Sequence, residues 1–341
     1  MKLLTVFFLF ASYQALAGLT PVSFEKNGEI ITEEAVRFNG GYGYNLNAKH
    51  VLKLVTLDWP PYIDENLCNK GWLYQFTVSS LLEKGYGVHI GFYPWARAVR
   101  EAELGRADIL FPEYFVEDDV ISDNFLDKTR NDLLALSHAI PGGDLSFVAL
   151  KGTQIPFNGD LNSVKDLPIG VVRSYKNTKE LDAMIDNKEI DTIVANNEYQ
   201  LIHLLLSNRV SLIVADLEVL KASVYKSELS ISGKRQILES LVALEPKLEY
   251  KPLYFSVSKS TPHWQKVLED LNDEIELMQQ SGKFDEFIEG MPLEEWVDDN
   301  IDWLMAVFEQ HHIPFDPEHI AWFYEAVNAE DWRCSSCGGC I

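Results

Sequence analysis

The segment 51–62, VLKLVTLDWPPY, decides the fold class of this chain. Residues 51–57 are mostly apolar or β-branched, which predicts a strand. Pro60 and Pro61 end that strand, because proline cannot donate a hydrogen bond to a β-ladder. Apolar residues at helical spacing in 71–85 then predict a helix. A strand that leads through a tight loop into a helix is the first unit of an α/β fold.

The alternation of strand and helix continues along the chain. Short apolar runs predict the strands, and apolar residues at helical spacing predict the helices between them. The expected strands are 51–57, 88–92, 107–111, 168–172, 192–194, 210–214 and 251–257, and the expected helices are 71–85, 95–104, 177–187, 198–207, 217–224 and 264–281. Two similar α/β units predict two lobes with a cleft between them. Residues 18–50, rich in Gly and Asn around 39–43, predict loop or edge structure.

Residues 1–17 have the pattern of a cleavable signal peptide. Lys2 supplies a positive start, residues 3–16 are almost wholly apolar, and Ala15 and Ala17 are the small residues that a signal peptidase accepts. The apolar run is too short to span a bilayer comfortably. We therefore expect an exported, periplasmic protein, with a retained anchor or a buried helix as the alternative.

The composition is strongly acidic, with a formal net charge of −23 over 341 residues. Such a chain repels nucleic acid and anionic membrane surfaces, so neither is an expected partner. Acidity keeps an exported protein soluble and also favours cationic ligands, and the composition leaves both explanations open. The length exceeds what one hydrophobic core usually serves and suits two lobes.

The C-terminal segment 292–341 differs from the rest of the chain. It carries eleven acidic side chains and one basic one. Apolar residues at helical spacing from Val297 to Phe308 predict one helix, and a second apolar set after the cap residue Asp316 predicts another. We expect an acidic helical hairpin packed on the main body, followed by a Cys-rich tail.

The four cysteines are Cys68, Cys334, Cys337 and Cys340. In an oxidising compartment four cysteines favour disulfides, and three complete pairings are open. The alternative is a soft-metal site that combines the last three cysteines with nearby histidines, which are His311, His312 and His319. Because export favours disulfides, no metal and no other cofactor is expected.

Several motifs follow one another along the chain in a characteristic order. They are LDWPPY at 57–62, YPWARA at 93–98 with GRADI at 105–109, LPIGVVRSY at 167–175 and NRVSLIVAD at 208–216. Together they resemble the bacterial extracellular solute-binding proteins of family 3, which are two-lobe periplasmic receptors of ABC importers. The resemblance covers about residues 50–290.

The resemblance implies an α/β, two-lobe periplasmic-binding-protein fold that closes like a clamshell on its ligand. Together with the sequence pattern outside residues 50–290, it predicts an N-terminal segment before the lobes and a helical extension after them. The expected units are 18–50 for the N-terminal segment, 51–145 with 246–291 for lobe one, 146–245 for lobe two, and 292–341 for the extension.

Residues at the ends of the predicted strands are the candidate ligand-binding residues, and they are Asp58, Trp59, Tyr62, Trp95, Arg97, Glu113, Arg173, Ser174, Tyr175 and Asp216. Trp59 and Tyr62 can sandwich a planar group or a cation. Arg97 can form a fork on an anionic group, and the helix start after Arg173 can hold an anion through backbone N–H groups. A packed turn, a surface ion pair and a plain strand–helix turn are the respective structural alternatives.

Asp216 matches the position at which the family's amino-acid receptors hold the ligand ammonium. The alternative is a helix cap for residues 217–224. The arginine with which those receptors clamp a carboxylate has no counterpart in residues 112–120. Glu113 lies in that stretch instead, and it would suit a cationic group if it faces the cleft.

The expected function is reversible capture of a small polar solute by a monomeric periplasmic protein that hands it to the membrane subunits of an ABC importer. An enzyme is not expected, because the sequence contains none of the common hydrolase, metalloprotease or phosphate-binding motifs. The alternative is an exported lyase-like enzyme or a partner-binding derivative of the same fold. Glu113 would be the acid of such a lyase, since this chemistry needs a carboxyl group with a raised pKa.

Overall fold

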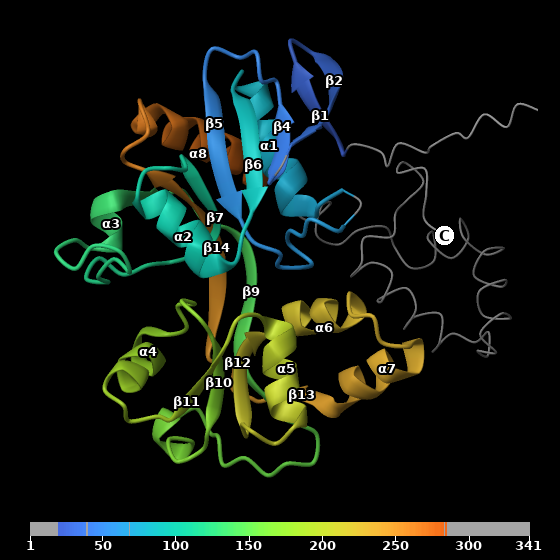
Figure 1. Ribbon diagram of the computed structural model, residues 1–341, viewed down its shortest axis with the longest axis vertical. Coiled ribbons are helices and arrows are strands. Elements are labelled where there is room, and N and C mark those ends of the chain that lie inside the picture. The colour runs from blue at the N-terminus through green and yellow to red at the C-terminus, as the bar shows by residue number, and fades with distance from the viewer. Residues whose placement is uncertain (1–19, 39, 68, 283, 285–341) are drawn as a thin grey trace, which may run out of the picture.

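A computed structural model of the chain describes residues 20–38, 40–67, 69–282 and 284. These residues form two α/β lobes joined by two long strands (Figure 1), so the predicted fold class is confirmed. The signal peptide, the four cysteines and the C-terminal hairpin lie outside the described residues and stay predictions. Within the described part, no helix is long and apolar enough to cross a membrane.

The upper lobe in Figure 1 is built on three parallel strands, β5 (Val51–Thr56), β6 (Gly87–Phe92) and β7 (Ile109–Tyr114). β5 is central and pairs with both β6 and β7. Helices α1 (Trp72–Glu83) and α2 (Trp95–Glu103) provide the crossovers that parallel strands require. Because parallel strands end at one edge of the sheet, the loops after β5 and β7 meet there.

The N-terminal segment contains strands where loop was predicted. Its first two strands form an antiparallel hairpin, while the next two extend the edge of the upper sheet through pairing with β6. The prediction of edge structure is thus confirmed and that of loop is wrong. A Cβ on Gly41 would lie 2.0 Å from the Ile90 carbonyl oxygen, so the glycine permits close strand approach. The strands are β1 (Pro21–Lys26), β2 (Glu29–Glu34), β3 (Val36–Phe38) and β4 (Gly41–Tyr44).

Two long strands connect the lobes. β9 (Ile140–Leu150) leads into the lower lobe and β14 (Glu249–Ser258) leads back out of it (Figure 1). The two strands pair antiparallel where they cross between the lobes. A short helix, α3 (Arg130–Leu133), and a short strand, β8 (Leu134–Leu136), precede β9. Paired connections of this kind form a hinge about which two lobes can rotate.

The lower lobe repeats the α/β plan. β10 is central and pairs parallel with β11 and β12, while β9 joins the other side of β12 in the antiparallel sense. The elements are η1 (Leu161–Ser163), β10 (Ile169–Val172), α4 (Lys179–Asp186), β11 (Thr192–Ala195), α5 (Glu198–Leu206), β12 (Leu212–Asp216), α6 (Leu217–Tyr225), α7 (Ile231–Ser240) and β13 (Leu241–Ala243). The helix predicted over 264–281 is confirmed as α8 (Trp264–Ser281), which packs on the upper lobe.

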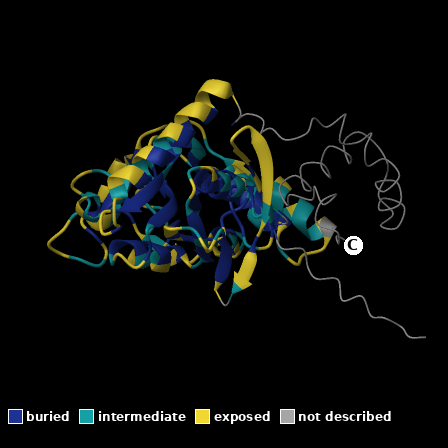
Figure 2. Cartoon of the chain, turned by 90° about the horizontal axis from the view of Figure 1, so that it is seen from above, coloured by how far each residue is buried: buried dark blue, intermediate teal, exposed yellow. Residues whose placement is uncertain are grey.

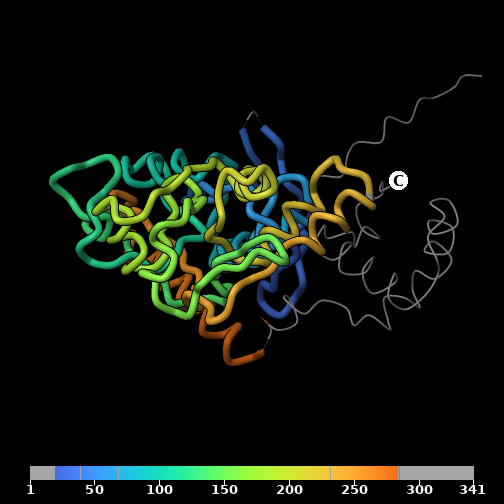
Figure 3. Tube along the Cα trace, turned by 90° about the horizontal axis from the view of Figure 1, so that it is seen from below, coloured from blue at the N-terminus to red at the C-terminus, as the bar shows by residue number. Residues whose placement is uncertain are grey.

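Alternating side chains build a core on each face of the lower sheet. Along β12, Leu212 and Val214 join one buried cluster, and Ile213 and Ala215 join the other. Seen from above, buried residues fill the interior and exposed ones lie on the outer helices and loops (Figure 2). Seen from below, the lower lobe lies in front of the upper one (Figure 3). Because both faces of β12 are buried, its residues from Leu212 to Ala215 form a continuous apolar run without polar alternation.

Candidate functional site

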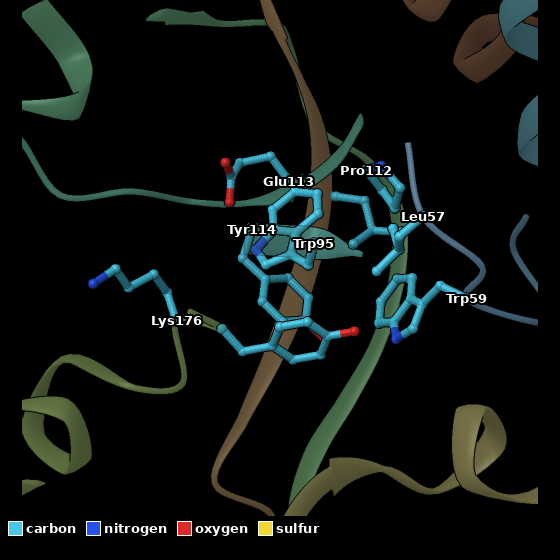
Figure 4. A pocket seen from close by; sticks show the side chains of 9 residues that line it. Leu57, Trp59, Trp95, Pro112, Glu113, Tyr114 and Lys176 are labelled. Carbon is cyan, nitrogen blue, oxygen red and sulfur yellow. The ribbon is translucent and has the colours of Figure 1, made fainter. Parts of the chain in front are cut away.

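A pocket lies between the two lobes, with about 290 Å³ of space that is partly open to solvent. Both lobes and the strand β14 contribute to its walls. The lining residues are Leu57, Trp59, Trp95, Pro112, Glu113, Tyr114, Tyr175, Lys176 and Leu253 (Figure 4). Most of the lining is aromatic or aliphatic, so the few charged groups dominate the electrostatics of the site.

The parallel strands explain why these residues meet. Trp59 follows β5, Glu113 and Tyr114 end β7, and Tyr175 follows β10, while Trp95 begins α2 after β6. The pocket therefore lies at the carboxyl ends of the strands of both lobes, where open α/β sheets bind ligands. Four residues predicted for the site line this pocket, namely Trp59, Trp95, Glu113 and Tyr175.

Trp59 and Tyr62 do not enclose a ligand between them. Their rings stack on each other, with centroids 4.7 Å apart and an interplanar angle of 19°. The Trp59 indole N–H donates to the Glu198 carboxylate at 2.8 Å, and the Tyr62 hydroxyl donates to the Asp216 carboxylate at 3.1 Å. Trp59 thus lines the pocket, while Tyr62 lies behind it and supports the indole. Contrary to the expected sandwich, the two rings form one wall.

Glu198 is a site residue that the sequence analysis missed. It is the first residue of α5, directly after the cap residue Asn197, and it is buried. Its carboxylate accepts hydrogen bonds from Trp59 and from the Tyr175 hydroxyl. Burial raises the pKa of Glu198 above its ordinary value. The available signal was an acid at the first position of the predicted helix 198–207, but such an acid is typical of an ordinary first helical turn.

Asp216 caps a helix, as the structural alternative predicted, and it also contacts the opposite lobe. One carboxylate oxygen caps α6 by accepting the backbone N–H of Glu218 at 2.8 Å, and the other accepts from Tyr62 of the opposite lobe. The side chain is buried, and burial raises its pKa to about 6. Asp216 is absent from the pocket lining, so it acts from behind the aromatic wall.

Glu113 faces the cleft and is also part of a buried ion-pair network. Arg130 donates to Glu113, Glu103 and Asp123, each at 3.2 Å. Burial, together with the neighbouring Glu103, outweighs the attraction of Arg130 and raises the pKa of Glu113 to about 7. Arg130 could not be identified from the sequence, because it lies outside every motif and pairs with residues up to 27 positions away.

Two predicted arginines lie outside the pocket. Arg97 is exposed, with its guanidinium 4.5 Å from the centre of the Tyr93 ring. Arg173 is exposed and donates to the Asn196 side chain at 3.4 Å. Neither belongs to the pocket lining. The expected fork on an anionic ligand group therefore has no support in this arrangement, and Arg97 lies on an aromatic ring instead of forming the surface ion pair that was its alternative.

Asp58 and Ser174 also lie outside the lining. Asp58 is exposed, and its carboxylate accepts the backbone N–H of Glu65 at 2.8 Å. The carbonyl oxygen of Ser174 accepts the Trp95 indole N–H at 3.2 Å. Asp58 therefore orders the loop after β5, while Ser174 positions Trp95 from the opposite lobe.

Contacts between the lobes hold the cleft closed. Three of them are the hydrogen bonds from Trp59 to Glu198, from Tyr62 to Asp216 and from Trp95 to the Ser174 carbonyl. A fourth is the ion pair between Lys226, directly after α6, and the buried Asp64. All four contacts join residues that are far apart in sequence. Three of them use the side chains of Trp59, Tyr62 and Trp95. Closure of the lobes therefore shapes the pocket.

Comparisons with known proteins divide the chain into two parts. A family described as PM0253 matches residues 269–330. The uncharacterized protein PM0253 of Pasteurella multocida strain Pm70 is 51% identical over 55 residues, which are 16% of this chain and 47% of that protein. The match thus spans about half the length of this curated relative, and most of it falls outside the described residues.

The two lobes are similar to solved structures of the periplasmic-binding-protein type. An ancestral arginine-binding protein bound to arginine gives a TM-score of 0.55 at 18% identity, covering 71% of this chain and 98% of its own. A substrate-binding protein of an amino acid ABC transporter from Streptococcus pneumoniae, bound to L-arginine, gives 0.53 at 14%, covering 71% and 93%. A histidine kinase sensor domain gives 0.54 at 15%, covering 70% and 94%. The chain has their two-lobe fold, as the sequence motifs predicted.

Proposed function

We propose that this protein binds a small polar solute reversibly between its two lobes. The observation that carries the proposal is the pocket at the carboxyl ends of the strands, to which both lobes contribute aromatic rings. A ligand that touches both lobes favours the closed form by its differential affinity for the two arrangements. Such binding requires neither a nucleophile nor a cofactor.

The proposal also includes the setting in which the protein acts. The solved structures with this fold include binding proteins of amino acid ABC transporters, and the N-terminal sequence has the pattern of a signal peptide. We therefore place the protein in the periplasm, as a monomer that delivers its solute to an ABC importer. The domain boundaries expected from the sequence belong to this proposal.

A thermal-shift screen followed by calorimetry tests the proposal. The screen uses amino acids, polyamines, organic acids and choline-type compounds. A compound at 100 times its Kd should stabilise the protein by about 2.7 kcal/mol, with the shift rising with the logarithm of concentration. If none of these compounds changes the melting temperature, the proposed function is wrong.

Two variants from one loop show whether binding occurs in this pocket. Tyr175→Ala removes a lining ring and should weaken the binding of any hit about tenfold or more. Arg173→Ala removes an exposed side chain two positions earlier and should leave affinity unchanged. Equal effects of the two substitutions would place the binding site elsewhere.

A lyase-like activity is the second candidate, because Glu113 is buried, faces the cleft and has a pKa raised to about 7. A carboxyl group of this kind can exchange protons near neutral pH. Its carboxylate, however, is bound by Arg130 and points away from the aromatic rings (Figure 4). Chromatography of each hit after long incubation with the protein decides between the two: unchanged compound supports a receptor, and a new product supports a lyase.

A further inference from the structure

We propose that the solute is a small organic cation without a carboxylate group, held by an aromatic box that is backed by buried carboxylates. This inference rests on the proposed function and specifies the ligand class of the same pocket. Three observations carry it: the arrangement of the rings, the burial of two carboxyl groups behind them that form no ion pair among the described residues, and the positions of the cationic side chains.

The rings form a box rather than a flat platform. Trp59 and Tyr114 meet edge to face, with centroids 5.9 Å apart at 80°, and Trp95 and Tyr175 do so at 6.4 Å and 89°. All four line the pocket. The face of an aromatic ring attracts a cation, and this attraction is stronger where water is excluded. Walls that stand at right angles can present ring faces to one ligand from several sides.

The polar edges of these rings are bound to a carboxylate. Glu198 accepts from the Trp59 indole N–H and from the Tyr175 hydroxyl. Donation to a negatively charged acceptor increases the electron density of a ring, which strengthens its attraction for a cation. Tyr62 stacks on one face of Trp59, so a ligand in the pocket can meet only the opposite face of that ring. Glu198 thus acts on a ligand through the rings that it orders.

Among the residues that the structure describes, the two carboxylates behind the wall form no ion pair. Within the described part of the chain, no lysine, arginine or histidine forms an ion pair with Glu198 or Asp216, although both are buried. An unpaired buried carboxylate is costly, and a cationic ligand nearby would reduce that cost. Burial raises the pKa of both groups, which is the expected effect of a missing counter-charge.

The cations around the pocket are placed unfavourably for a carboxylate ligand. Arg130 is shared among three acids. Lys251 donates to the Asn177 carbonyl at 2.8 Å and pairs with Glu249 at 3.4 Å, and its ammonium lies 5.2 Å from the centre of the Tyr114 ring, so its charge is already satisfied within the protein. Lys176 lines the pocket, but its ammonium lies on the side of the Glu113 carboxylate and points away from the rings (Figure 4). An α-carboxylate would therefore meet acids without a guanidinium fork to hold it.

Calorimetry with matched probes tests the ligand class. Choline and its neutral carbon isostere 3,3-dimethylbutan-1-ol have nearly the same shape, and agmatine differs from arginine by the absence of a carboxylate. We expect choline to bind about 30-fold or more tightly than its isostere, and agmatine more tightly than arginine. If the isostere binds at least as tightly as choline, or if arginine or glutamate binds at least as tightly as agmatine, the ligand class is wrong while the proposed function stands. If no probe and no amino acid binds, both are wrong.

Glu198→Gln removes the negative charge and keeps an acceptor for Trp59 and Tyr175. It should weaken choline or agmatine binding about 30-fold and leave binding of the neutral isostere unchanged. Glu180→Gln, on the exposed start of α4, is the matched control and should change neither. Circular dichroism establishes folding, and Asp216→Asn serves as the second variant because asparagine caps a helix equally well. Unchanged cation affinity in either cleft variant would refute the role of the buried carboxylates.

Discussion

Replacing Asp216 by asparagine should stabilise this protein near neutral pH, although the substitution removes a partner of Tyr62. Asp216 is 6% exposed, and burial raises its pKa from the ordinary 3.8 to about 6. Asparagine has the same shape and can still cap α6 by accepting the N–H of Glu218. The substitution therefore removes the buried charge and preserves the local structure.

The magnitude follows from the two pKa values. The rise from 3.8 to about 6 corresponds to about 3 kcal/mol of penalty on the ionised native state. The lost charge-assisted bond from Tyr62 offsets about 1 to 2 kcal/mol of that gain. We expect the Asp216→Asn variant to be about 1 to 2 kcal/mol more stable than the wild type above pH 6.

The sign of the pH dependence is specific. Between about pH 4 and pH 6 the unfolded chain loses the Asp216 proton while the native state keeps it, so the free energy of unfolding of the wild type falls as pH rises. The variant lacks this dependence, so its advantage should grow across that window and stay constant above it.

Urea denaturation at half-unit steps from pH 4 to pH 7.5 measures this difference. Asp119→Asn, at an exposed position, controls for the loss of one negative charge. Parallel curves for the Asp216→Asn variant and the wild type would refute the assignment of a raised pKa to Asp216. So would an advantage that shrinks as pH rises.

Three further predictions concern neighbouring residues. The free energy of unfolding of the wild type should fall as pH rises from about 4.5 to about 7, because the native state keeps the Glu113 proton that the unfolded chain releases. Glu113→Gln should abolish this fall, and urea denaturation across that range checks it. Arg130→Met leaves Glu103 and Glu113 buried without their cation, so it should cost about 3 to 5 kcal/mol of unfolding free energy at pH 7, with a smaller cost at pH 4. Gly143→Ala places a Cβ 1.9 Å from the Asp216 carboxylate and 2.7 Å from the Tyr62 hydroxyl, so it should favour the open lobes and increase the radius of gyration in small-angle scattering; an unchanged radius would contradict this role of the glycine.

The fold could be predicted because its signals are local. The run 51–57 and the helix 264–281 have hydrophobic patterns that only one secondary structure satisfies. The N-terminal strands were the exception. Glycine there was interpreted as a sign of loop, whereas Gly41 permits close contact between strands. The same residue type serves both purposes, and the sequence pattern does not distinguish them.

The site could be predicted only in part, because a position at a strand end does not fix where a side chain points. Trp59, Trp95, Glu113 and Tyr175 follow or begin elements at the cleft edge and line the pocket. Arg97 comes from the same edge but turns outward onto Tyr93. Side-chain direction depends on packing within the finished structure, which the linear sequence does not contain.

The sequence by itself determined the order of strands and helices, and through it the two lobes, because hydrophobic periodicity is a property of neighbouring residues. The tertiary structure alone decided which acids face one another across the cleft. Trp59 meets Glu198 at a separation of 139 residues, and Tyr62 meets Asp216 at 154. Both contacts join the two lobes across the cleft, and burial there raises the pKa of the two carboxyl groups. That burial depends on both lobes at once, so no local stretch of sequence could have indicated it.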